Sequence, residues 1–445
     1  MNYQNLKNIT LFIIASVFLF SCNNDELFEG SFDTGKPTAS ENGKFRLTED
    51  EAIQNLQLFL DEFDQPAEGD VATRSKPVRS IGNVQVIGKK EQEATSLRSD
   101  DPSGLRSLLL TVQEDTILYL INFEDEGGFA IVSADKRSNK IYAIIDEGTL
   151  DVNEIDQVDN PGFNMFLEEA IVSELRSVDH DDLAYGVELY SGERPGRPVE
   201  VPNKIKPLLK TKWGQDYPYN QFSPNHTTGC VPTAIAQIFS YYRPVNSVSY
   251  TDSYHKTNPS SNLTWNKILW DCESASVYGV LDSYKAYQSS LQVAHLMRYI
   301  GINVKAYYDQ ETGDTGANSG IAIAWLYNSM GFSKSMKMRE YDSWAAYKAL
   351  AGGNLIYMTA SAGGNVGHAW VADGGFLHRG FVDGRGSEVY HEYYLHCNWG
   401  WNGFCDGYYL DFNLSNGADS KENIDRPGYI NAKYSSPINM VIMKR

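Results

Sequence analysis

Apolar residues recur at helical spacing in two segments of the first 200 residues. In the first segment they are Ile53, Leu56, Leu60 and Phe63. Thr48 and Glu51 precede it with the spacing of a capping box, which predicts an amphipathic helix that starts after Thr48. In the second segment, Pro161 opens a helical pattern of Phe163, Phe166, Leu167, Ile171 and Leu175. Proline is well tolerated in the first turn of a helix, so a second helix is expected from Pro161.

Between these helices the apolar pattern becomes typical of strands. The β-rich runs are Val84–Ile87, Leu108–Val112, Thr116–Phe123, Gly128–Ser133 and Lys140–Ile145. Glu126-Gly127-Gly128 interrupts them as a hairpin turn would. The stretch from Pro66 to Gly104 is polar and irregular apart from its one strand. Tyr190–Pro207 holds four prolines and two glycines and is interpreted as an exposed linker, where proteases cut most easily.

In the second half, one apolar helix begins at a cysteine. Gly229 forms a turn before Cys230, and Ile235, Ile238 and Phe239 follow at helical spacing. The helix dipole favours a thiolate at this position, which is the state a sulfur nucleophile needs. Free cysteines are also often buried and inert, so the local pattern alone leaves both interpretations of Cys230 open.

Charge divides the chain near residue 200. Residues 1–200 hold 38 acidic and 17 basic residues, whereas residues 201–445 hold 19 acidic and 21 basic residues. All eight tryptophans follow position 200. The contrast predicts two folding units. The acidity, together with the lack of a basic cluster, argues against a nucleic-acid partner.

The first residues predict export. Lys7 precedes a 12-residue apolar run that ends at Phe20, which is too short to span a bilayer and suits a secretory signal. Ser21-Cys22 resembles a bacterial lipoprotein cleavage site, at which Cys22 would be lipidated. An ordinary signal peptide cut nearby is the alternative. The polar, acidic residues after Cys22 then form a tether, and the protein is expected at the outer membrane or cell surface, or secreted after processing.

Five residues of the second half follow one another in an order that is typical of one class of hydrolase. Gln215 comes 15 residues before Cys230, His368 follows 138 residues after it, and Asn398-Trp399 comes later. Each residue alone has a structural interpretation, such as a surface glutamine or a core histidine. The order and the Cys-to-His interval are those of papain-like hydrolases.

On these motifs residues 205–445 resemble the streptopain family of papain-like cysteine peptidases. The matching stretches are Trp213-Gly214-Gln215, Tyr217-Pro218-Tyr219-Asn220, Thr228-Gly229-Cys230-Val231, Thr233-Ala234, Ala236-Gln237-Ile238, Gly367-His368-Ala369, Asp373-Gly374 and Asn398-Trp399-Gly400-Trp401. The acidic half is similar to that family's inhibitory propeptide, chiefly through residues 128–137.

The resemblance implies an α+β architecture. A papain-like catalytic domain, with the nucleophile on its helical part and the histidine on its antiparallel β part, would follow an α+β propeptide domain. The boundaries are then 1–21 for the signal peptide, 22–45 for the tether, 46–200 for the inhibitory propeptide and 201–445 for the peptidase domain.

The resemblance also implies roles for single residues. Cys230 would be the nucleophile, His368 the general acid and base, and Gln215 an oxyanion-hole donor. Asn398 would orient His368 through its side-chain oxygen, with Trp399 as a shield. Asp373 is a rival orienter, but a strand would place it on the opposite face. Substrate backbone would approach three glycines, which are Gly363, Gly364 and Gly367.

The expected function is therefore an exported cysteine endopeptidase made as a zymogen. Its partners would be protein or peptide substrates, its own propeptide as an intramolecular inhibitor, and a membrane through the lipid at Cys22. Cleavage between about Arg194 and Lys210 would release activity. No cofactor and no metal site are predicted. A disulfide between Cys397 and Cys405 stays open.

Functions from other classes remain open at this point. A Cys-His-Asn site also carries out amide transfer, so an amidase or a transglutaminase is one alternative. The other is a catalytically inactive surface lipoprotein that binds host proteins or glycans, for which the 28 tyrosines would provide binding patches.

Overall fold

The computed structural model describes residues 45–65, 79–88, 116–179, 201–272, 284–361, 367–381, 389–411 and 438–445. Several predictions lie outside these ranges: the signal segment with Cys22, the strand at Leu108–Val112, most of the linker, and both Gly363 and Gly364. Among the helices that fall inside them, none has the length and apolarity needed to cross a membrane.

The elements of the first half follow the predicted order closely. They are α2 (Glu49–Phe63), β1 (Ile81–Gly88), β2 (Thr116–Phe123), the short 3-10 helix η1 (Glu124–Glu126), β3 (Phe129–Ser133), β4 (Ile141–Ile145), the 3-10 helix η2 (Val152–Gln157) and α4 (Pro161–Asp179). The capping box is confirmed, because the Glu51 backbone N–H donates to Thr48 Oγ1 and the Thr48 N–H donates to the Glu51 carboxylate, at 3.2 and 2.8 Å. The two helices predicted from apolar spacing are α2 and α4.

The second half has a helical part and a sheet part. The helical part comprises α5 (Cys230–Tyr242), β6 (Ser247–Ser249), β7 (Ser260–Asn262), α6 (Trp265–Cys272), α7 (Tyr284–Asn303), β8 (Tyr307–Tyr308), β9 (Thr315–Gly316) and α8 (Ser319–Ser329). The sheet part comprises β5 (Lys204–Ile205), β10 (Arg339–Glu340), α9 (Ser343–Ala351), β11 (Ile356–Ser361), β12 (Gly367–Phe381), β13 (Val389–Asn398), β14 (Gly407–Leu410) and β15 (Asn439–Ile442). The architecture is α+β, as predicted.

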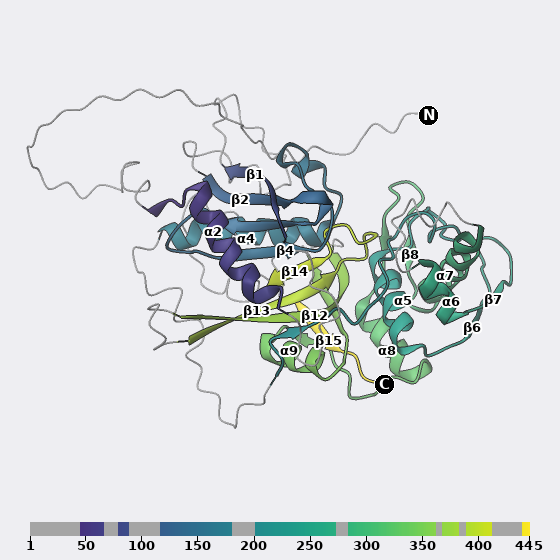
Figure 1. Cartoon of the computed structure of the whole chain (residues 1–445). Helices are drawn as coiled ribbons and strands as arrows, with labels where there is room; N and C mark the ends of the chain where they lie inside the picture. The colour runs from purple at the N-terminus through teal and green to yellow at the C-terminus, as the bar shows by residue number, and fades with distance from the viewer. Residues whose placement is uncertain are drawn as a thin grey trace, which may run out of the picture.

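Strands from both halves form one antiparallel sheet. Within the described ranges its order is β1-β2-β3-β4-β14-β13-β12-β11-β15-β10, and β5 pairs with β12. The join is the β4–β14 pair, in which Ile144 lies opposite Tyr408. Figure 1 shows β4 and β14 side by side between the two halves, with the helical part to one side. The acidic first half is therefore joined to the second half by backbone hydrogen bonds.

One hydrophobic core crosses this join. Phe63 of α2 packs edge-on against Phe376 of β12 and Tyr408 of β14, with ring centroids 5.0 and 4.9 Å apart. From α4, Phe166 packs against Tyr409 at 4.5 Å. A second core fills the helical part around α5. Buried aromatic rings contribute strongly to the stability of a core. The packing of α2 and α4 therefore holds the first half against the sheet part of the second half.

The linker prediction holds only in part. Of Tyr190–Pro207, the described residues 201–207 include β5, in which Ile205 is buried and lies opposite Gly375 of β12. The burial of Ile205 and the hydrogen bonds with β12 outweigh the local prolines, which had predicted an exposed loop. Hydrogen bonds of β5, Leu208 and Leu209 thus hold this stretch against β12, although Lys206 and Pro207 are exposed.

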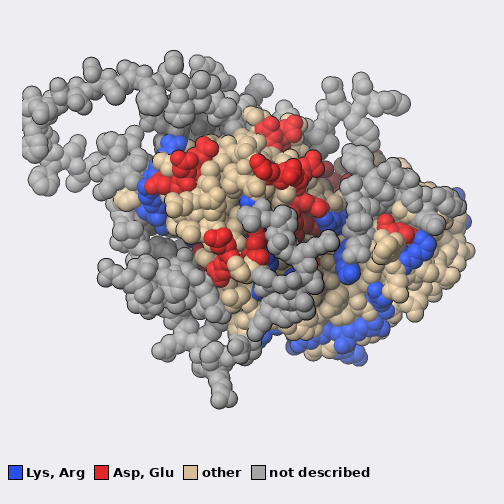
Figure 2. All heavy atoms as spheres, in the orientation of Figure 1, with Lys and Arg blue, Asp and Glu red and all other residues tan. Residues whose placement is uncertain are grey.

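Charge is also divided in space. Figure 2 shows acidic side chains gathered over the part of the molecule that holds β1–β4, and a group of basic side chains near the C-terminus. Among the described residues, Lys212 forms an ion pair with Glu147 across the join, and His396 and His378 bond to Asp146 and Glu62 of the first half. The cysteines at positions 230, 272, 397 and 405 are all free thiols, so Cys397 and Cys405 do not pair.

Candidate active site

Cys230 is the first residue of α5, as predicted. Gly229 before it has φ +87°, a backbone conformation that favours glycine. A Cβ at Gly229 would also lie 2.5 Å from the Thr315 methyl group of β9. Both facts require glycine at position 229. The close approach of Thr315 also places the β8–β9 hairpin beside Cys230, which is half-buried.

His368 lies on β12 and is brought to Cys230 by the packing of α5 against that strand. Its side chain is buried, with 3% of its surface exposed. The backbone N–H of the next residue, Ala369, lies close enough to the Cys230 sulfur to lower the pKa of that thiol. The packing of α5 on β12 therefore places the Cys230 sulfur beside the backbone that directly follows His368.

The partner of the His368 side chain is a backbone carbonyl. His368 Nε2 donates to the Trp399 carbonyl oxygen at 3.1 Å. Aromatic rings enclose the imidazole, with the Trp370 and Trp401 centroids 6.0 and 5.7 Å away. The imidazole is thus held in a largely apolar setting by one polar contact.

The prediction that the Asn398 side chain contacts His368 is wrong for this structure. Asn398 Nδ2 donates to the Thr211 carbonyl at 2.7 Å, and Asn398 Oδ1 accepts from Gln237 Nε2 at 2.7 Å. Both the nitrogen and the oxygen of the Asn398 amide are therefore bonded to residues other than His368. Trp399 is fully buried beside His368, as a shielding role requires, and its carbonyl makes the contact with His368 that was expected of the Asn398 oxygen.

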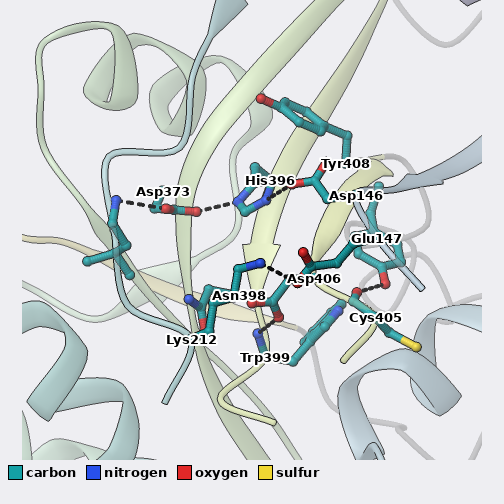
Figure 3. A network of polar contacts seen from close by, with 12 residues as sticks. Asp146, Glu147, Lys212, Asp373, His396, Asn398, Trp399, Cys405, Asp406 and Tyr408 are labelled. Atoms are coloured by element: carbon teal, nitrogen blue, oxygen red, sulfur yellow. Dashed lines mark hydrogen bonds and ion pairs between the residues drawn. The ribbon is translucent and has the colours of Figure 1, made fainter. Parts of the chain in front are cut away.

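Asp373 is not an alternative orienter. Its carboxylate accepts from His396 Nδ1 at 2.5 Å and from the Leu209 backbone N–H at 2.9 Å. The other nitrogen of His396 bonds to Asp146, from the first half, at 3.1 Å, as Figure 3 shows. Burial alone would lower the pKa of His396, but the two carboxylates raise it well above its usual range. Asp373 therefore belongs to a polar network across the join between the halves.

Gln215 lies next to the nucleophile through its backbone. Its carbonyl accepts from the Thr228 backbone N–H at 2.9 Å, two residues before Cys230. The Gln215 side chain is buried, with 7% exposed. Gly367, the predicted substrate-binding glycine that the structure describes, is exposed at the start of β12 and lies opposite Ser361.

Burial favours the neutral forms of Cys230 and His368 in the full chain. Burial raises the pKa of the Cys230 thiol above its ordinary 9.0, although hydrogen bonds from Ala369 and from the helix N-terminus oppose the shift. Burial also lowers the pKa of His368 to about 4, despite the contact with Trp399. The helix dipole predicts a thiolate, but desolvation outweighs it in this arrangement.

The first half reaches the residues that support His368. Gly162 of α4 packs against the Trp399 ring, since a Cβ on Gly162 would lie 2.1 Å from Trp399 Cε3. Beside it, Asn160 Nδ2 donates to the Phe404 carbonyl at 2.9 Å. The sequence predicted the helix start at Pro161 but not these two contacts, because the local pattern carries no information on Trp399 and Phe404, which are distant in the chain.

Metal chemistry has no candidate ligands in the parts of the chain that the structure describes, where no group of three His, Cys, Asp or Glu side chains could hold an ion. A cysteine at the start of a buried helix, beside a histidine on an antiparallel strand, defines a papain-like cysteine hydrolase.

Comparison with known proteins gives the family. Residues 213–409 match the model of the Peptidase C10 family. Streptopain of Streptococcus pyogenes is 28% identical over 325 residues, covering 66% of this chain and 73% of streptopain. The thiol protease/hemagglutinin PrtT of Porphyromonas gingivalis is 23% identical over 324 residues, covering 67% of this chain and 34% of that protein. Residues 213–409 thus match the Peptidase C10 (streptopain) family, and the chain is a cysteine endopeptidase.

Two solved structures are also similar. A prointerpain A fragment of Prevotella intermedia matches with a TM-score of 0.49 and 21% identity, covering 74% of this chain and 96% of that chain. Active interpain A of the same organism matches with a TM-score of 0.37 and 24% identity, covering 55% and 97%.

Proposed function

We propose that the chain is the latent precursor of an exported endopeptidase in which Cys230 is the nucleophile and His368 the general acid and base. One observation carries the assignment: the Cys230 sulfur, at the start of α5, lies near enough to the backbone N–H of Ala369, the residue that follows His368, for that group to lower the thiol's pKa. Both residues lie within the matched family region, and peptide hydrolysis by a thiol needs an imidazole nearby, which supports this pairing.

The proposed reaction has two stages. The Cys230 thiolate adds to the carbonyl carbon of a peptide bond, and the tetrahedral intermediate collapses when His368 gives its proton to the leaving amine. His368 then takes a proton from water, which attacks the thioester and releases the acid product and the thiol. During both stages the Trp399 carbonyl holds His368 through Nε2. Trp399, rather than the Asn398 side chain, is thus the proposed orienting group.

Replacing Gln215 by alanine is expected to lower kcat about a hundredfold or more while changing KM little. We propose that its side-chain amide and the Cys230 N–H donate to the developing oxyanion, and such donors act mainly in the transition state. Steady-state kinetics of the processed enzyme on a peptide substrate test this. Gln221→Ala is the control in the same loop, since Gln221 bonds only to the Pro218 carbonyl and Tyr287 among the recorded contacts. Equal kcat values for the two variants would remove Gln215 from the oxyanion hole.

We further propose that the first half keeps the enzyme latent. The support is the burial that favours neutral Cys230 and His368 in the full chain, together with the packing of Gly162 on Trp399. A thiol and a neutral imidazole cannot start the reaction as an ion pair can. Residues from Lys204 to Leu209 are held on the peptidase sheet, so activating cleavage is proposed between Arg194 and Asn203.

Export and anchoring rest on the sequence. We propose that Cys22 is lipidated and tethers the precursor to the outer membrane, because it follows an apolar run of signal length. Cells fed an alkyne-labelled fatty acid are expected to incorporate the label into the wild-type protein and not into Cys22→Ser. The Cys272→Ser protein is the matched control and should carry the label. Labelling of the Cys22→Ser protein would refute the anchor.

A further inference from the structure

Gln237 of α5 is a buried polar residue without a part in the mechanism above. Its side chain is fully buried in a helix face that is otherwise largely apolar. A buried amide is costly unless its donors and acceptor are bonded, so its partners indicate what it does.

Gln237 belongs to a closed ring of three hydrogen bonds. Thr211 Oγ1 donates to Gln237 Oε1 at 3.0 Å, and Gln237 Nε2 donates to Asn398 Oδ1 at 2.7 Å. Asn398 Nδ2 closes the ring on the Thr211 carbonyl at 2.7 Å. All three residues are buried. Figure 3 shows Asn398 next to Trp399.

The orientation of both amides follows from their neighbours. The Thr211 carbonyl can only accept, so Asn398 must turn its NH2 group toward it. Asn398 Oδ1 then faces Gln237, which must present its own NH2 group. The Thr211 hydroxyl is left to donate to Gln237 Oε1. The ring therefore needs an amide at position 237 that both donates and accepts.

The ring is one peptide group away from His368. Asn398 Oδ1 also accepts from the Gly400 N–H at 3.2 Å. That N–H and the Trp399 carbonyl belong to the same planar peptide group, and the carbonyl accepts from His368 Nε2. Fixing the Gly400 N–H therefore fixes the direction of the carbonyl that holds the imidazole.

The helix supplies the reference frame. Gln237 lies seven residues after Cys230, about two helical turns, so both project from nearly the same face of α5. Gly400 has φ +73°, and a Cβ there would lie 3.1 Å from the Thr233 methyl group. The 399–400 peptide is thus seated on the helix that carries the nucleophile.

We propose that Gln237 is a positioning residue: through Asn398 and the 399–400 peptide it aligns the acceptor of His368 with the helix that carries Cys230. The inference rests on the proposed catalytic roles of these two residues. In this proposal the alignment of thiol and imidazole depends on α5 and on contacts within the second half. The alignment therefore persists when the first half is removed.

Gln237→Met and Gln237→Glu test the proposal in the processed enzyme. Each full-length variant is processed in trans by tagged wild-type enzyme, which is then removed, so that slow self-processing does not affect the amount of product. The measurements are kcat, KM, the pH profile of kcat/KM and the thermal midpoint. Gln292→Met is the matched control, because Gln292 of α7 bonds only to Thr264 among the recorded contacts.

Gln237→Met is expected to lower kcat by about tenfold or more with KM within about twofold, since misaligned reacting groups cost rate more than binding. The alkaline limb of the profile should move to lower pH, because the Trp399 contact favours the protonated imidazole. In Gln237→Glu the introduced carboxyl can donate to Asn398 only when protonated. Activity of that variant should therefore recover as the pH is lowered, relative to wild type.

The outcomes separate the two hypotheses. If Gln237→Met loses thermal stability but keeps the kcat and alkaline limb of Gln292→Met, Gln237 is structural and the inference is overturned. If processed wild-type protein has no peptidase activity that depends on Cys230, the proposed function fails instead.

Discussion

Replacing Cys230 by alanine is expected to abolish peptide hydrolysis by the processed chain, with a loss in kcat on the order of 10⁴-fold or more. The sulfur is the atom that would form the acyl-enzyme, and no other described thiol lies beside a histidine on β12 in this way. His368→Ala should cause a loss of similar size, because the two groups act as a unit and their effects do not add. Hydrolysis of a fluorogenic peptide by single and double variants measures this.

Two matched controls accompany these variants. Cys272→Ala removes a buried thiol of α6 whose pKa is raised to about 12 by burial, and it should retain activity. His295→Ala removes an imidazole that stacks on Phe222 with ring centroids 4.0 Å apart, in the helical part. Wild-type kinetics in folded Cys230→Ala or His368→Ala protein would end the assignment of that residue.

The second large effect is the release of Cys230 reactivity on cleavage. At pH 7 iodoacetamide is expected to alkylate Cys230 about a hundredfold faster in the processed enzyme than in the full chain. A thiol with a pKa above 9.0 is ionised in about one molecule in a hundred or fewer at this pH, whereas a thiol paired with imidazolium is almost fully ionised. Mass spectrometry of a partly processed sample measures both forms in one tube.

The pH dependence of this difference has a definite sign. Because burial raises the pKa of the Cys230 thiol above 9.0, its alkylation rate in the full chain should climb as the pH is raised and keep climbing above pH 9, toward that of the processed form. Gly162→Leu is an independent variant, because a side chain there cannot fit against Trp399 and should loosen the first half. It should speed alkylation in the full chain at pH 7. Equal rates for the full and processed wild-type chains would contradict latency through Cys230 and His368.

Much of the fold could be predicted from local pattern. The capping box at Thr48 and Glu51 marks the start of α2, and Pro161 marks the start of α4, because helix starts depend on neighbours three or four residues away. The runs at Thr116–Phe123, Gly128–Ser133 and Lys140–Ile145 appear as β2, β3 and β4. These signals are local, and alternating or apolar runs report directly on burial.

The site could be predicted only as far as its residue types. Motif order identified Cys230 and His368, and the fold brings them together. The carbonyl of Trp399 as the partner of His368 was not predictable, because a backbone oxygen carries no sequence signal. Gln237 stood in a recognised motif, but its role depends on Thr211 and Asn398, which are distant along the chain.

The sequence alone determined the strands, the two amphipathic helices and the cysteine at the start of α5, since these follow from periodicity and caps over a few residues. Tertiary structure alone decided that β4 pairs with β14, that Asn398 bonds to Gln237 and not to His368, and that burial favours the neutral forms of both reactive groups in the full chain. Each of these three outcomes depends on which parts of the chain, distant in sequence, pack together and exclude water. Desolvation and long-range pairing are properties of the packed chain, and no local run of residues encodes them.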